Sequence, residues 1–212
     1  MRNDYLTVAG EGTTDIHIKK SQFIAFVARA ETEDEANEFI NRIKKEHHTA
    51  THNCSAYVVG ENQRFQKAND DGEPSGTAGV PILEVLLKQN LTDTVVVITR
   101  YFGGIKLGSG GLIRAYGQAT TKGIEATGVV LRKKHHVMSI AIDYTWLGKV
   151  ENEVRQSSYQ LKEIVYLEDV QLFLYVPLER EDEFREWITE MTNGQADITI
   201  DETVFLEIPQ TN

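Results

Sequence analysis

The stretch that decides the fold is "DTVVVITRYFGGIKLGSGGLIRAYG", residues 93–117. Its first part is a nearly continuous apolar run, which predicts a central strand that is covered on both faces. Six of the chain's 16 glycines follow between residues 103 and 117, and a helical pattern runs from about Leu112 to Thr127. A strand, a glycine loop and a helix in this order can present free backbone N–H groups to an anion.

Two interpretations of the glycine loop are open: it binds an anion, or it packs tightly against the sheet. The Walker fingerprint does not fit, because Gly108 is followed by Ser109 and not by a lysine. The dinucleotide fingerprint also fails, because Ile113 stands where it needs a glycine. The candidate residues for binding phosphate or RNA are Arg100, Gly103, Gly104, Lys106, Gly108, Gly110, Gly111 and Arg114, and Lys67 is expected to border the same face.

A second polar loop, "NDDGEPSGTAG" at residues 69–79, is the alternative place for chemistry. Carboxylates in such a loop could hold a metal or act as a base, and a serine nucleophile would need a base such as His52. The structural alternative is a turn that caps the neighbouring strand and helix. The residues of the alternative catalytic loop are Asp70, Asp71, Glu73 and Ser75.

Four potential zinc ligands lie close together in the sequence, at His47, His48, His52 and Cys54. Their spacing matches no familiar structural zinc site. Alternation along a strand over residues 52–59 instead predicts a buried Cys54 and a half-buried His52. We therefore expect neither a metal nor a cofactor.

Charge is distributed unevenly along the chain, which has a net charge of −10. Residues 1–134 contain 17 Lys and Arg against 16 Asp and Glu, whereas residues 135–212 contain 5 against 16. The change predicts two domains, 1–134 and 135–212, joined near "LRKKHH" at 131–136. Nucleic-acid binding relies on cations, so the acidic domain is better suited to a protein partner.

Periodicity supports an α+β fold in both predicted domains. The first shows two strands around Lys19–Ser21, a helix capped by Thr32, and a hairpin that turns at "GEN", residues 60–62. The second follows the order βαββαβ, which is the ferredoxin-like arrangement. The single cysteine and the lack of a long apolar run or signal peptide predict a cytoplasmic protein without membrane association.

Three long motifs closely resemble the Impact family, in its bacterial YigZ-like branch: "THNCSAYVVG", "QKANDDGEPSGTAGVPILEVL" and "VVVITRYFGGIKLGSGGLIRAYG". "GKVENEVR" and "ITEMTNG" resemble the C-terminal domain of that branch. The resemblance implies a first domain similar to the second domain of ribosomal protein S5. It implies a second domain similar to the last domain of elongation factor G, which is ferredoxin-like.

The resemblance implies a role in translation. Eukaryotic Impact proteins regulate translation during amino-acid starvation through an additional RWD domain, which we expect this chain to lack because it begins almost directly with Impact-like sequence. The bacterial branch is associated with nucleic acid or the ribosome by analogy of fold. Kinases of the galactokinase type also share the S5-like fold, so a nucleotide-binding enzyme is the alternative. We expect a non-enzymatic protein that binds RNA or the ribosome. A module that only binds proteins is the third interpretation.

Overall fold

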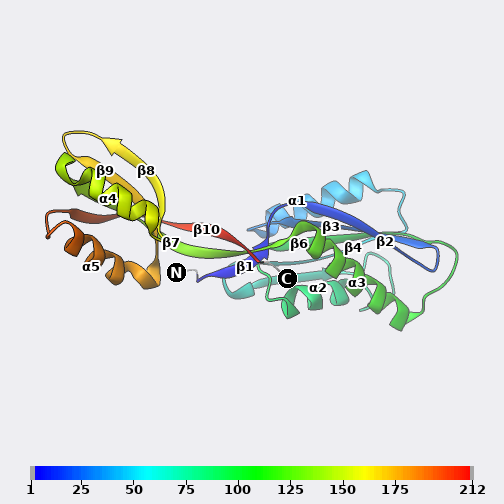
Figure 1. The fold of residues 1–212 in the computed structure, drawn as a ribbon. Coiled ribbons are helices and arrows are strands. Elements are labelled where there is room, and N and C mark those ends of the chain that lie inside the picture. The colour runs from blue at the N-terminus through cyan, green and yellow to red at the C-terminus, as the bar shows by residue number, and fades with distance from the viewer. Residues whose placement is uncertain (1–2, 211–212) are drawn as a thin grey trace. The chain divides into compact units, whose positions relative to one another are not determined.

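The computed structural model describes residues 3–210, which form two compact units (Figure 1). One unit comprises the chain up to Arg132 together with the residues from Ile208 onward, and the other is Lys133–Glu207. The division falls inside one long strand, β7 (Val129–Ile142). The predicted domain boundary, between Lys134 and His135, lies two residues further along this strand.

The first unit is built on a five-stranded sheet in the order β2-β3-β6-β4-β5. Every neighbouring pair in it is antiparallel. The apolar strand of the decisive stretch is β6, and it lies in the middle of the sheet. A short strand, β1 (Tyr5–Val8), pairs instead with the beginning of β7. The strands of the five-stranded sheet are β2 (Gly12–Ile18), β3 (Ser21–Arg29), β4 (His52–Val59), β5 (Phe65–Asn69) and β6 (Thr94–Tyr101).

Helices cover both faces of this sheet. Val95 and Val97 of β6 pack with α1 (Glu33–Glu46) on one face. The alternate residues Val96 and Ile98 pack on the other face with α2 (Gly79–Lys88) and α3 (Ser109–Thr127). The prediction of a central strand that is buried on both sides is confirmed.

One of the two predicted helix starts in the first unit agrees with the structure, and the other begins earlier than predicted. Thr32 caps α1 as predicted, because its Oγ1 accepts the backbone N–H of Glu35 at 3.2 Å. Helix α3 begins at Ser109, three residues before the predicted start, so Gly110 and Gly111 belong to its first turn. Among the helices of residues 3–210, none combines the length and apolar character that crossing a membrane requires.

The second unit has the predicted ferredoxin-like order βαββαβ. Its strands lie in the spatial order β10-β7-β9-β8, and β8 and β9 are adjacent antiparallel strands. Alternate residues of β9, from Val170 to Val176, are buried in a core that also contains Val150 of the first helix and Phe184 of the second. Both helices therefore cover one face of the sheet, and the predicted α+β fold with two domains is confirmed. The further elements are α4 (Tyr144–Gln156), β8 (Gln160–Tyr166), β9 (Val170–Pro177), α5 (Glu181–Met191), β10 (Asp197–Gln210) and the short 3₁₀ turns Glu61–Gln63 and Leu178–Arg180.

Candidate functional site

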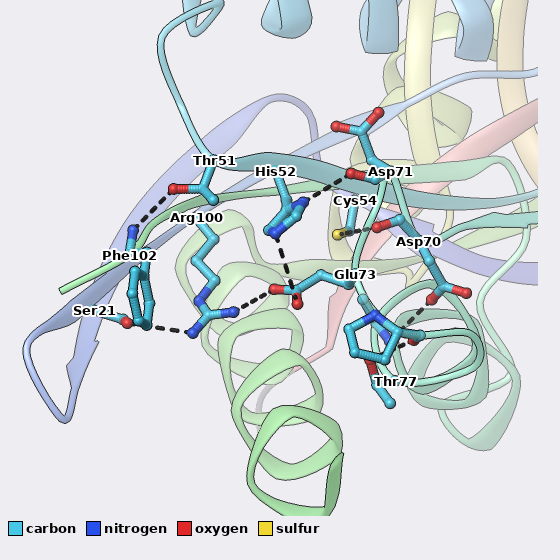
Figure 2. A network of polar contacts seen from close by, with 12 residues as sticks. Ser21, Thr51, His52, Cys54, Asp70, Asp71, Glu73, Thr77, Arg100 and Phe102 are labelled. Atoms are coloured by element: carbon cyan, nitrogen blue, oxygen red, sulfur yellow. Dashed lines mark hydrogen bonds and ion pairs between the residues drawn. The ribbon is translucent and has the colours of Figure 1, made fainter. Parts of the chain in front are cut away.

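A buried ion pair joins the end of β6 to the polar loop at residues 69–79 (Figure 2). Arg100 Nη1 lies 2.5 Å from Glu73 Oε1, and these side chains are only 6% and 3% exposed. The hydroxyl of Tyr116 on α3 donates to the same carboxylate oxygen at 2.8 Å. His52 Nε2 lies 3.8 Å from the other oxygen, Oε2. Side chains of the same unit thus contact both oxygens of the Glu73 carboxylate.

Arg100 therefore lies beneath the glycine loop and not on its surface. Its guanidinium is 5.3 Å from the ring centroids of both Phe23 and Phe102, and its Nη2 is 3.5 Å from Ser21 Oγ. The buried Nε of Arg100 has no hydrogen-bond partner in the described part of the chain. Among the cations predicted to bind phosphate, Arg100 is the one that the fold uses internally.

The carboxylates of the second loop form structural contacts (Figure 2). Asp70 accepts backbone N–H groups from Gly76, Ala78 and Gly79 at 2.8 to 3.0 Å and so caps α2. Burial by itself would raise the pKa of Asp70, but these three donors outweigh it and hold the pKa below its usual value. Asp71 accepts from Lys44 Nζ at 2.6 Å and from the backbone N–H of Asn53 at 2.7 Å.

The same loop does not assemble a catalytic group. Ser75 is exposed, and no hydrogen bond joins it to His52, whose Nδ1 bonds the backbone oxygen of Asp71 at 2.8 Å. Within residues 3–210, no group of three or more His, Cys, Asp or Glu side chains is arranged to hold a metal ion. The geometry favours the capping interpretation of this loop.

Cys54 is buried below these loops, as the alternation of its strand predicts. Its Sγ lies 3.0 Å from the backbone oxygen of Asp70 and 3.3 Å from the Tyr116 hydroxyl. Burial raises the pKa of the Cys54 thiol to about 12, and the carboxylates of Glu73, Asp71 and Asp70 add to the increase against the opposing Tyr116 hydrogen bond. The thiolate, which is the reactive form, is therefore disfavoured.

We expect Cys54 to resist thiol reagents while the protein is folded. At pH 8 the native thiol should react at least ~100-fold more slowly with an aromatic disulfide reagent than the same thiol in denaturing urea, because it is both buried and protonated. Absorbance of the released thiolate measures both rates. Equal rates in the two conditions would contradict this description of the cluster.

The glycine loop combines close packing with an exposed helix start. A Cβ atom on Gly103 would lie 2.0 Å from the backbone oxygen of Lys20, so this glycine lets the loop pack on the turn between β2 and β3. Gly108 has φ +73° and precedes α3, where no side chain caps the helix. No atom lies within 4 Å of the place of a Cβ on Gly104, at φ +86°, or on Gly108, whereas a Cβ on Gly111 would lie 2.9 Å from Leu107 Cβ.

Two of the predicted cations lie at this helix start. Lys106 and Arg114 are exposed, and neither has an acidic partner among the contacts of residues 3–210. Arg114 Nη1 is 3.8 Å from the place of a Cβ on Gly110, so its guanidinium reaches back along the first turn of α3. No acidic residue lies in that turn. Positive side chains at the positive end of a helix are unfavourable, and an anion there would relieve this.

The structure adds Lys19 and Lys20 to the cations near the glycine loop, which the sequence motifs do not indicate. They form the exposed two-residue turn between β2 and β3, with φ +46° and +68°. Asparagine and glycine are the residues that such turns favour. The available signal was a pair of lysines between two alternating strands. Lys67 is exposed on the edge strand β5, two strands away from β6.

Comparison with known proteins matches both parts of the chain. A family model described as the Impact N-terminal domain matches residues 19–124, which include the whole glycine loop. IMPACT family member YvyE of Bacillus subtilis (strain 168) is 58% identical over 207 residues, which cover 98% of this chain and 95% of that protein. The chain belongs to the Impact family.

Other Impact-family relatives cover both units as well. IMPACT family member YigZ of Escherichia coli (strain K12) is 30% identical over 196 residues, covering 92% of this chain and 96% of that protein. A model described as a domain of unknown function (DUF1949) matches residues 140–195. A crystal structure titled as that of a hypothetical protein has a TM-score of 0.60 at 29% identity, over 95% of this chain and 99% of that one.

Proposed function

We propose that this Impact-family protein regulates translation in the cytoplasm by binding RNA, free or in the ribosome, without catalysing a reaction. The binding site is the glycine-loop surface, which we define as Lys19, Lys20, Phe102, Lys106 and Arg114. The observation that carries the proposal is the start of α3, which is exposed and lacks both a side-chain cap and an acidic residue in its first turn. Such a helix start with cations beside it suits a phosphate.

The aromatic residue at the loop favours RNA over a free phosphate. Phe102 is 45% exposed and directly follows β6. The guanidinium of Arg100 lies against the Phe102 ring, and the backbone N–H of Phe102 donates to Thr51 Oγ1 at 3.1 Å. An exposed ring held in this way can stack with an unpaired base while neighbouring lysines contact the backbone. The combination is typical of proteins that bind single-stranded nucleic acid.

The geometry gives less support to the nucleotide-binding enzyme. Before its carboxylates could contact a substrate, each would have to give up a structural partner. These partners are the start of α2 for Asp70, Lys44 for Asp71 and Arg100 for Glu73. The third interpretation is a module that only binds proteins. It predicts that Lys106 and Arg114 bind neither RNA nor a nucleotide. An RNA titration therefore separates the RNA-binding proposal from both alternatives.

The test is the binding of a labelled single-stranded RNA to the full chain, measured by fluorescence anisotropy at several salt concentrations. Lys106→Ala/Arg114→Ala should weaken binding about tenfold and reduce the salt slope by about 1.4, because two phosphate contacts to a single strand are lost. Both side chains are exposed, so the free energy of unfolding should change by less than ~0.5 kcal/mol for each.

The matched control is Lys88→Ala/Lys122→Ala, which removes two exposed cations from α2 and α3 away from the loop. This variant should retain nearly the affinity of the unchanged protein. An equal loss in both variants would indicate general attraction between charges. An affinity unaffected by the loop variant would refute the proposed site.

A further inference from the structure

An acidic groove of about 620 Å³ lies on the second unit, between the end of α4 and the outer side of α5. Both helices cover the same face of their sheet (Figure 1). Four exposed carboxylates line the groove: Glu153 on α4, and Glu183, Glu186 and Glu190 on α5. The three on α5 are spaced three and four residues apart, so they share one helical face.

These carboxylates are poorly compensated by the chain itself. Among the described residues, Arg180 is the single cation that lines the groove, and it pairs with Glu183 through Nε at 3.0 Å and Nη2 at 2.6 Å. Glu153, Glu186 and Glu190 have no ion pair within residues 3–210. The groove therefore carries an excess of about three negative charges, which favours a cationic occupant and opposes RNA.

The aromatic lining of the groove suits a guanidinium. The rings of Tyr159 and Trp187 stack with centroids 5.5 Å apart and an interplanar angle of 26°. The chain's own Arg180 lies 4.6 Å from the Tyr159 centroid while it bonds Glu183. One guanidinium is thus already held between an aromatic face and a carboxylate. Trp187, with Glu186 and Glu190 beside it, offers the same pair of partners to a second one.

A buried hydroxyl in this lining is an independent sign of a missing partner. Tyr159 is 8% exposed, and its hydroxyl has no hydrogen-bond partner in the described part of the chain. Burial raises the pKa of Tyr159, so the hydroxyl keeps its proton and remains a donor. A buried donor without an acceptor is costly. A backbone oxygen of a bound peptide would satisfy it after a small movement of the Arg180 side chain, about a third of which is exposed.

We propose that this groove binds an arginine side chain of a partner protein, within a segment rich in arginine. The guanidinium stacks on Trp187 and bonds Glu186 and Glu190, and the peptide backbone meets Tyr159. Arginine is preferred to lysine because its planar group can both stack on a ring and form paired hydrogen bonds with carboxylates. This proposal is independent of RNA binding, which uses other residues in the other unit.

The test is the binding of a labelled synthetic peptide of alternating glycine and arginine to the full chain, measured by fluorescence anisotropy. Glu186→Gln/Glu190→Gln should weaken this binding about fivefold, since two exposed ion pairs are lost. The control Glu163→Gln/Glu168→Gln makes the same change of net charge in the same unit at exposed residues outside the groove. The control should change the affinity by less than about twofold.

Comparison peptides define the remaining outcomes. A peptide with lysine in place of arginine should bind more weakly, and one with glutamine should not bind measurably. Equal weakening by both protein variants would show attraction to the acidic unit as a whole and would overturn the groove. Equal binding of the lysine peptide would overturn the preference for arginine, and no binding of the arginine peptide would overturn the site.

Discussion

Glu73→Gln should lower the free energy of unfolding of the first unit by about 3–5 kcal/mol. The amide retains the shape of the side chain and can still accept the Tyr116 hydrogen bond, but it leaves the charge of Arg100 uncompensated in a site where that side chain is 6% exposed. Urea unfolding measures the change. The single cysteine, Cys54, lies beside this cluster, and its reactivity towards a thiol reagent follows the unfolding of the first unit.

A surface ion pair of the same unit provides the control. Glu84 Oε2 lies 3.8 Å from Lys88 Nζ on α2, with side chains 57% and 78% exposed. Glu84→Gln should therefore cost less than about 1 kcal/mol. Adding Arg100→Met to Glu73→Gln should restore part of the lost stability, because neither position then carries a buried charge without its partner. A similar small effect of both single substitutions would refute the structural role of the buried pair.

Most of the fold could be predicted because the local patterns and the tertiary structure agree. Three patterns in the sequence are each compatible with a single local structure: the continuous apolar run of β6, the Thr32 cap and the βαββαβ order. The beginning of α3 was missed because Ser109, Gly110 and Gly111 are weak helix formers. The division between the two units falls within the charged stretch at 131–136, as the change of charge predicts. The charge pattern does not show that this stretch is part of one strand, β7, which pairs first with β1 and then with β9.

The candidate site was less predictable because its partners are distant in the sequence. The sequence motifs assign Arg100 and Glu73 to different candidate sites, and only the fold brings these residues, 27 positions apart, into one ion pair. In the same way, the close approach of Gly103 to Lys20 adds the lysine turn to the glycine loop. Composition shows which charges a chain has. The sheet determines which of them neutralise each other and which remain available.

Phe184→Ala should lower the free energy of unfolding of the second unit by about 3–5 kcal/mol. Phe184 is 0% exposed in the core between α5 and the sheet. Its ring lies edge-on to Tyr159 at 4.9 Å and to Trp187 at 6.0 Å between centroids. Truncation removes these contacts and leaves a cavity. The measurement is urea unfolding followed by tryptophan fluorescence, because Trp146 and Trp187 are the only tryptophans and both belong to this unit.

The control is Tyr166→Ala, which removes an aromatic side chain that is 58% exposed in the same unit and should cost less than about 1 kcal/mol. The Phe184 variant also tests the proposed division into two domains, because the sole cysteine lies in the first unit. If the domains unfold independently, Phe184→Ala shifts the fluorescence transition and leaves the transition in Cys54 reactivity unchanged. An equal shift of both transitions would mean that the two units unfold together, and that the predicted boundary separates them in structure but not in stability.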